Sequence, residues 1–316
     1  MIERALTFGP DGGLVGVLTE PDGPQAEAGR PGVLFLNSGI LHRVGASRIY
    51  VQVARRLASE GFTAFRFDHA GVGDSAVRRD DGSFRDSAIR EARAAMDLLA
   101  ERRGVDRFIL AGLCSGADMA YWAALEDPRV VGLVQIDPFV YRTRRFLLRY
   151  YLPRLVSPAA WWRSLSARTR WALGRLRPGT EDEADAVWVA PEYTRVFPPR
   201  EEVARGLARL RERGVVFWVW ITGDMGEHVN YSGQYRESFP EVPFGPDGLE
   251  EHVVPDADHT VTGLEHQARV VEAVADWSRR HWEPSRAGSG GGSGDAEAPD
   301  GGAPLPRPAP ATGVSG

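Results

Sequence analysis

Short apolar runs alternate with turns and with segments of helical period, and this alternation limits the possible folds more than any other feature of the chain. The runs are rich in β-branched and aromatic residues, as in strands that are buried on both faces. The predicted strands of this first part are 33–36, 63–67, 108–111 and 130–136, and the helices between them are 48–59, 87–103 and 117–125. Strands that alternate with helices predict an α/β fold with a mostly parallel, doubly wound sheet.

The two ends of the pattern complete this sheet. Ile2–Phe8 and Leu14–Thr19 flank the turn Pro10–Gly13 and predict an opening hairpin. Near the other end, strands are predicted at 215–221 and 251–254, followed by a closing helix at 264–281.

A compositional break divides the predicted sheet. Residues 141–177 are dense in arginine and aromatic residues and contain no Asp or Glu. After residue 283 the chain is mainly Gly, Pro, Ala and Ser, which cannot bury a core. The predicted organisation is a first core part at 1–139, a helical cap inserted at 140–205, a second core part at 206–283 and a disordered tail at 284–316.

Charge and cysteine content exclude several classes of function. The net charge of −5 gives no reason for binding nucleic acid or an anionic membrane. The start of the chain lacks the pattern of a signal peptide and no apolar run is long enough to span a membrane, so we expect a cytoplasmic protein. Because Cys114 is the one cysteine, an internal disulfide and a cysteine-based zinc cluster are excluded. Cys114 is either a buried thiol or a nucleophile.

The segment Phe108–Ala117 favours the nucleophile. It consists of a predicted strand, the turn Gly112-Leu113-Cys114-Ser115-Gly116 and the start of a helix. A nucleophile at such a corner has a strained backbone that exposes its side chain, and glycine two residues away on each side avoids a collision. This symmetry selects Cys114 over Ser115, and the helix that follows should lower the pKa of the thiol.

Two further segments, together with this corner, make residues 2–282 resemble the α/β-hydrolase superfamily. They are Leu34-Phe35-Leu36-Asn37-Ser38-Gly39-Ile40 and Asp68-His69-Ala70-Gly71-Val72-Gly73-Asp74-Ser75. The chain is similar to the cysteine-containing dienelactone hydrolases and, in its Asn-Ser-Gly-Ile and Gly-Leu-Cys-Ser-Gly-Ala wording, to exosortase-associated hydrolases. The resemblance implies that the backbone N–H groups of Ile40 and Ser115 form an oxyanion hole.

A thiol nucleophile needs a general base and a carboxylate that orients it. His259 lies between the last predicted strand and the last helix, where the superfamily has its catalytic histidine. Asp224, at the end of strand 215–221, is the predicted acid by family position, while Glu227 and Asp137 are alternatives. His42, His69 and His228 follow strand ends and could line the pocket.

The predicted activity is acyl chemistry on an ester or thioester, by hydrolysis or by acyl transfer, and the superfamily includes such enzymes in natural-product pathways. Two alternatives remain open: elimination of a carboxylate from an O-acylated substrate, and a non-catalytic module that binds a carrier protein. The expected partners are a small acyl substrate and, from the basic aromatic insertion, an acyl carrier protein. No metal or organic cofactor is implied.

Overall fold

A mostly parallel sheet forms the framework of the chain in the computed structural model, which describes residues 1–22, 29–77, 82–155 and 195–283. In these ranges eight strands form one sheet in the order β1-β2-β4-β3-β5-β6-β7-β8. The strands are β1 Ile2–Phe8, β2 Leu14–Glu20, β3 Gly32–Leu36, β4 Ala64–Phe67, β5 Phe108–Leu113, β6 Val130–Ile136, β7 Val216–Thr222 and β8 Leu249–Val254. The hairpin β1–β2 is antiparallel and β2 pairs antiparallel with β4, whereas all other pairs are parallel.

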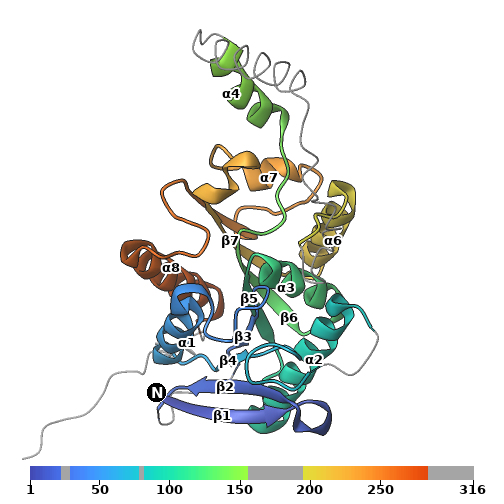
Figure 1. Cartoon of the computed structure of the whole chain (residues 1–316), viewed down its shortest axis with the longest axis vertical. Coiled ribbons are helices and arrows are strands. Elements are labelled where there is room, and N and C mark those ends of the chain that lie inside the picture. Colours follow the sequence, from blue (N-terminus) through green and yellow to red (C-terminus); the bar gives the residue numbers. More distant parts are fainter. Residues whose placement is uncertain (23–28, 78–81, 156–194, 284–316) are drawn as a thin grey trace, which may run out of the picture. The chain divides into compact units, whose positions relative to one another are not determined.

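Helices cover both faces of the sheet. They are α1 Ile49–Ser59, α2 Phe84–Arg103, α3 Ser115–Glu126, α4 Arg144–Leu155, α6 Arg200–Glu212, α7 Gln234–Ser238 and α8 Leu264–Trp282, with the short 3-10 helices η1 Pro10–Gly12, η2 Ala46–Arg48 and η3 Gly223–Glu227. Helices α1 and α8 lie on one side of the sheet, and α2, α3 and α6 on the other (Figure 1). None of the helices described is long and apolar enough to cross a membrane.

The central strands read as continuous apolar runs because both of their faces are covered. Successive residues of β5 contribute to opposite sides: Leu110 packs in the core beneath α2 and α3, and Ile109 in the core beneath α1 and α8. Every residue of β3, β4 and β5 is buried. The predicted α/β class and the doubly wound, mostly parallel sheet are confirmed.

The main differences from the sequence prediction lie at element ends. Helix α2 begins one turn earlier than predicted, because Ser83 caps it by accepting a hydrogen bond from the Asp86 N–H at 3.1 Å. Helix α6 crosses residue 205, the predicted end of the cap, and buries Leu207 and Leu210 in the same core as α3. Most of the predicted cap (156–194) and the predicted disordered tail (284–316) lie outside the described residues.

Tyr50 links the ends of β3 and β5, which carry predicted site residues. Its buried hydroxyl donates to the Leu36 carbonyl at 3.1 Å, at the end of β3, and accepts from the Leu113 N–H at 2.8 Å, at the end of β5. One side chain from α1 thereby fixes the positions of the loop after β3 and of the corner after β5.

Replacing this hydroxyl should therefore cost stability. In Tyr50→Phe the Leu113 N–H stays buried without its acceptor, so we expect the free energy of unfolding to fall by about 2 kcal/mol. Chemical denaturation monitored by circular dichroism measures the change. The control is Tyr151→Phe, since Tyr151 is 52% exposed. Equal stability of the two variants would contradict this role of Tyr50.

Candidate active site

Cys114 occupies the sharp corner between β5 and α3 that the sequence predicts. Its backbone has φ 55° and ψ −121°, a conformation that is strained for any residue other than glycine. A Cβ on Gly112 would overlap the backbone of Gly116, and one on Gly116 would lie 2.6 Å from the Leu36 carbonyl oxygen. Both glycines are therefore required for α3 to pack this closely against β5 and the end of β3.

Ser115, the neighbour of Cys114, has a structural use for its hydroxyl. Its Oγ accepts a hydrogen bond from the Gly39 N–H at 2.7 Å and so ties the loop after β3 to the start of α3. The backbone N–H groups of Ile40 and Ser115 make no hydrogen bond to another residue within the described ranges. The two donors predicted for an oxyanion hole are thus left without a protein acceptor there.

Hydrogen bonds join the loop after β4 to the loop after β3. The carboxylate of Asp68 accepts from the Arg43 N–H at 2.6 Å and also pairs with the Arg43 guanidinium. Asn37 accepts from the His69 N–H at 2.6 Å and donates to the Leu41 carbonyl at 2.9 Å. These bonds fix the backbone that carries Ile40.

His259 lies beside Cys114. Its imidazole is close enough to the thiol to lower the pKa of Cys114. Its Nδ1 lies 2.6 Å from Oδ2 of Asp137, which leaves Nε2 for the sulfur. The structure brings these two predicted site residues together.

The carboxylate at the imidazole is that of Asp137, the alternative acid, and not that of Asp224, which the family position predicts. Asp137 follows β6 directly with φ 51°, and it is fully buried. Its two oxygens also accept from the N–H and the hydroxyl of Thr222, each at 2.7 Å. Asp224 instead accepts from the backbone N–H of His259 at 2.7 Å. The structure therefore uses Asp224 to hold the loop and Asp137 to hold the ring.

Arg195 is the residue of this site that sequence reasoning missed. Its guanidinium pairs with both oxygens of Asp118, at 2.7 and 2.8 Å, and donates to the Asp137 carbonyl at 2.9 Å. Its Nη1 lies 3.8 Å from the sulfur of Cys114. No motif marks this arginine, because only the fold brings it to a corner 81 residues earlier in the chain.

Charge at this site favours a thiolate beside an imidazolium. Burial opposes ionisation of Cys114, but the hydrogen bond from His259 and the positive charge of Arg195 outweigh it, so the pKa of the thiol is lowered. The hydrogen bond to Asp137, followed by that to Cys114, raises the pKa of His259 to about 10. Burial raises the pKa of Asp118 to about 6, and its pairing with Arg195 opposes this rise.

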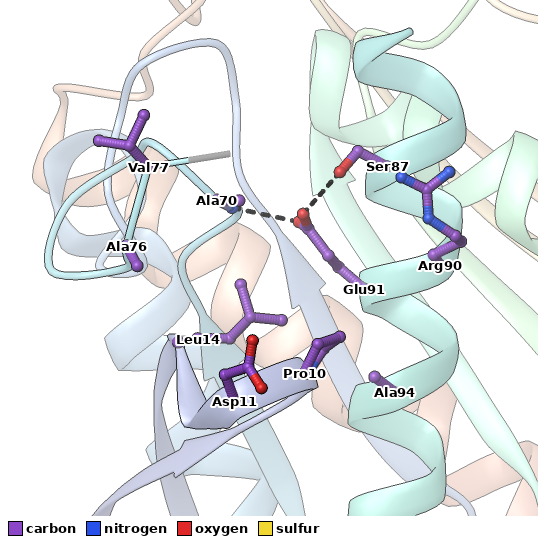
Figure 2. A pocket seen from close by; sticks show the side chains of 11 residues that line it. Pro10, Asp11, Leu14, Ala70, Ala76, Val77, Ser87, Arg90, Glu91 and Ala94 are labelled. Carbon is purple, nitrogen blue, oxygen red and sulfur yellow. Dashed lines mark hydrogen bonds between the residues drawn. The ribbon is translucent and has the colours of Figure 1, made fainter. Parts of the chain in front are cut away.

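A pocket of about 430 Å³ opens beside Cys114 and is lined by Ser115 and Arg195, among others. A second pocket of about 530 Å³ lies between η1, the loop after β4 and α2 (Figure 2). None of Cys114, His259, Asp137 or Arg195 lines this larger pocket. Of these four residues Arg195 lines the smaller pocket, and Ser115, the neighbour of Cys114 in the chain, lines it too. The smaller pocket is therefore the candidate for holding a substrate near the sulfur.

Glu91 in the larger pocket has a structural role. Its carboxylate accepts from the Ala70 N–H at 3.2 Å and from the Ser87 hydroxyl at 2.8 Å (Figure 2). It also contacts Nδ1 of His69 at 2.6 Å, and His69 is fully buried. The sequence suggested that His69 could line the active-site pocket, but this buried side chain does not line it.

In the ranges that the structure describes, no three His, Cys, Asp or Glu side chains are grouped so that they could hold a metal ion.

Comparison with known proteins places the chain in a family. The profile of the family described as serine aminopeptidase, S33, matches residues 33–196, just over half of the 316 residues. The chain belongs to this family. It is an enzyme of the α/β-hydrolase fold, and it has Cys114 at the corner that gives the serine enzymes their nucleophile. Among curated proteins, none matches this S33 family member.

Solved structures of the same fold resemble it over nearly their whole length. An α/β serine hydrolase without a lid from Xanthomonas campestris is 18% identical, with a TM-score of 0.51 over 90% of this chain and 96% of the other. An esterase from Pyrococcus furiosus is 14% identical, with a TM-score of 0.56 over 89% and 91%. Naproxen esterase from Bacillus subtilis is 15% identical, with a TM-score of 0.51 over 87% and 90%. At these identities the likeness shows the shared fold.

The lowered pKa of the thiol predicts how this S33 family member reacts with iodoacetamide. Since a thiolate reacts and a thiol does not, the alkylation rate of Cys114 should reach its plateau below the pH range of an ordinary cysteine, whose pKa is about 8.5. The inflection of the rate with pH should move to higher pH in His259→Ala and, by less, in Arg195→Gln. Each substitution removes a positive charge that lies near the sulfur. The pH dependence of alkylation, followed by intact mass, measures this.

Arg142→Gln is the matched control, since Arg142 donates to the Glu227 carbonyl and is exposed. The pH profile of its alkylation should coincide with that of the enzyme without substitutions. An inflection at or above pH 8.5 in the enzyme without substitutions would show that the site does not stabilise a thiolate.

Proposed function

We propose that this enzyme is an acyl hydrolase that uses Cys114 as nucleophile, His259 as general acid and base, and Asp137 as the residue that orients the imidazole. Its substrates are small-molecule esters or thioesters. The observation that supports this best is the continuous chain of contacts from Asp137 through His259 to the sulfur, which stands at a strained corner. Such a chain of nucleophile, base and orienting acid is what covalent acyl catalysis requires.

The first half-reaction forms an acyl-enzyme. The thiolate of Cys114 attacks the carbonyl carbon, a C–S bond forms, and the carbonyl electron pair moves onto oxygen. The N–H groups of Ile40 and Ser115 then donate to this oxyanion. When the tetrahedral intermediate collapses, the bond to the leaving group breaks and the imidazolium of His259 donates its Nε2 proton to the departing alkoxide or thiolate.

The second half-reaction restores the thiolate. Neutral His259 takes a proton from water as the water oxygen attacks the thioester carbonyl. Collapse of the second intermediate breaks the C–S bond and releases a carboxylic acid, which leaves Cys114 as thiolate and His259 as imidazolium. An alcohol, amine or thiol in place of water would give acyl transfer through the same intermediate.

The resting charges favour this covalent route over an elimination. Removing a proton from a substrate carbon needs a neutral imidazole, whereas a pKa of about 10 keeps His259 protonated at neutral pH. The same protonated ring is ready to serve the leaving group of an acyl transfer. Covalent catalysis is accordingly the function that the charges of the site support best.

A direct experiment tests the covalent step. The enzyme is mixed with p-nitrophenyl esters of short and medium acyl chains, quenched in acid, and its intact mass is measured. We expect an added acyl mass on Cys114, together with release of p-nitrophenol. Cys114→Ala should lose both, and turnover that survives this substitution would refute the proposal.

Substitution of the two acids tests which one orients His259. Asp137→Asn should lower kcat by about 10³- to 10⁴-fold, as loss of the orienting carboxylate does in a serine triad. Asp224→Asn should lower kcat far less, because its carboxylate contacts the backbone of His259 and not the ring. Steady-state kinetics on one ester measures both variants. A greater loss in Asp224→Asn would make Asp224 the orienting acid.

A further inference from the structure

The pocket beside Cys114 has an apolar wall that leads away from the reacting atoms. Met119 and Trp122 of α3, and Phe139 after β6, line this wall. Ser115 and Arg195 line the end nearest the sulfur. A pocket with such a lining favours an acyl chain that extends along α3 from the carbonyl group under attack.

Arg85 places a positive charge beside this wall. Its guanidinium stacks over the ring of Trp122 at 4.3 Å, and it also lines the pocket. It forms no ion pair with any residue of the described ranges. A cation in the first turn of a helix is opposed by the helix dipole, so the stability of α2 does not explain an arginine there.

The other charged groups of the pocket direct an anion toward Arg85. The charge of Arg195 is balanced by Asp118, which it contacts through two hydrogen bonds. Glu202, which lines the pocket from α6, repels an anion from its own side. Arg85 is thus the cation left for a negatively charged ligand in the described part of the pocket.

We propose that this pocket binds an acyl chain that carries a carboxylate at its far end, so that the substrate is a monoester or monothioester of a dicarboxylic acid. The chain packs on Met119, Trp122 and Phe139, and the carboxylate pairs with Arg85. This specificity rests on the proposed function, since it assigns the acyl side of the substrate that Cys114 attacks.

Binding of unreactive amides tests the pocket independently of catalysis. Octanamide and 7-carboxyheptanamide have acyl chains of the same length, and only the second carries a terminal carboxylate. Calorimetry at low ionic strength should show that the carboxylate form binds more tightly by about fivefold, the size of a partly exposed ion pair. This preference should disappear in Arg85→Gln, persist in Arg85→Lys and weaken with added salt.

Arg102→Gln is the matched control, because Arg102 lies in the last turn of the same helix and does not line this pocket. Its preference should equal that of the unmodified enzyme. Equal binding of the two amides, or a preference that survives in Arg85→Gln, overturns the proposal.

Turnover of the two matching p-nitrophenyl esters separates this inference from the proposed function. A carboxylate preference in kcat/KM that depends on Arg85 supports both. A carboxylate preference in amide binding with no acyl adduct on Cys114 would support the pocket and refute the covalent mechanism. An adduct on Cys114 with no carboxylate preference would support the covalent mechanism and refute the proposed carboxylate site.

Discussion

The hydrogen bond between Asp137 and Nδ1 of His259 is the interaction on which the site depends. It fixes the face of the imidazole toward the sulfur and raises the pKa of the ring, and the charged ring in turn lowers the pKa of the Cys114 thiol. Asp137 can do this because Thr222 binds both of its oxygens and Arg195 binds its carbonyl. These hydrogen bonds can hold Asp137 in a strained backbone conformation, with φ 51°.

Packing of the sheet brings these groups together. Strands β5, β6 and β7 are neighbours in the sheet, so Cys114, Asp137 and Thr222 meet where their parallel carboxyl ends share one edge. Tyr50 and Ser115 then attach the loop after β3 to the same edge. The chemistry therefore rests on short, local connections to a rigid framework.

Much of this arrangement could be predicted from the sequence. Continuous apolar strands, the glycines around Cys114 and the loop position of His259 are local signals, and each predicts its own geometry. The choice between Asp137 and Asp224 is not local. Both follow strands that end at the same edge of the sheet, and only the hydrogen bonds of the folded chain distinguish them. Arg195 was missed for the same reason, because pairing with Asp118 is a property of the folded chain. The cytoplasmic location and the carrier-protein partner stay predictions from sequence.

Two carboxylates on neighbouring strands contact one histidine, the first through its ring and the second through its main chain. Either of these two strands can therefore present a carboxylate to the same loop. A position-by-position transfer of roles between relatives does not tell which of the two carboxylates orients the ring. In enzymes of this fold, the partner of the imidazole has to be read from the ring itself.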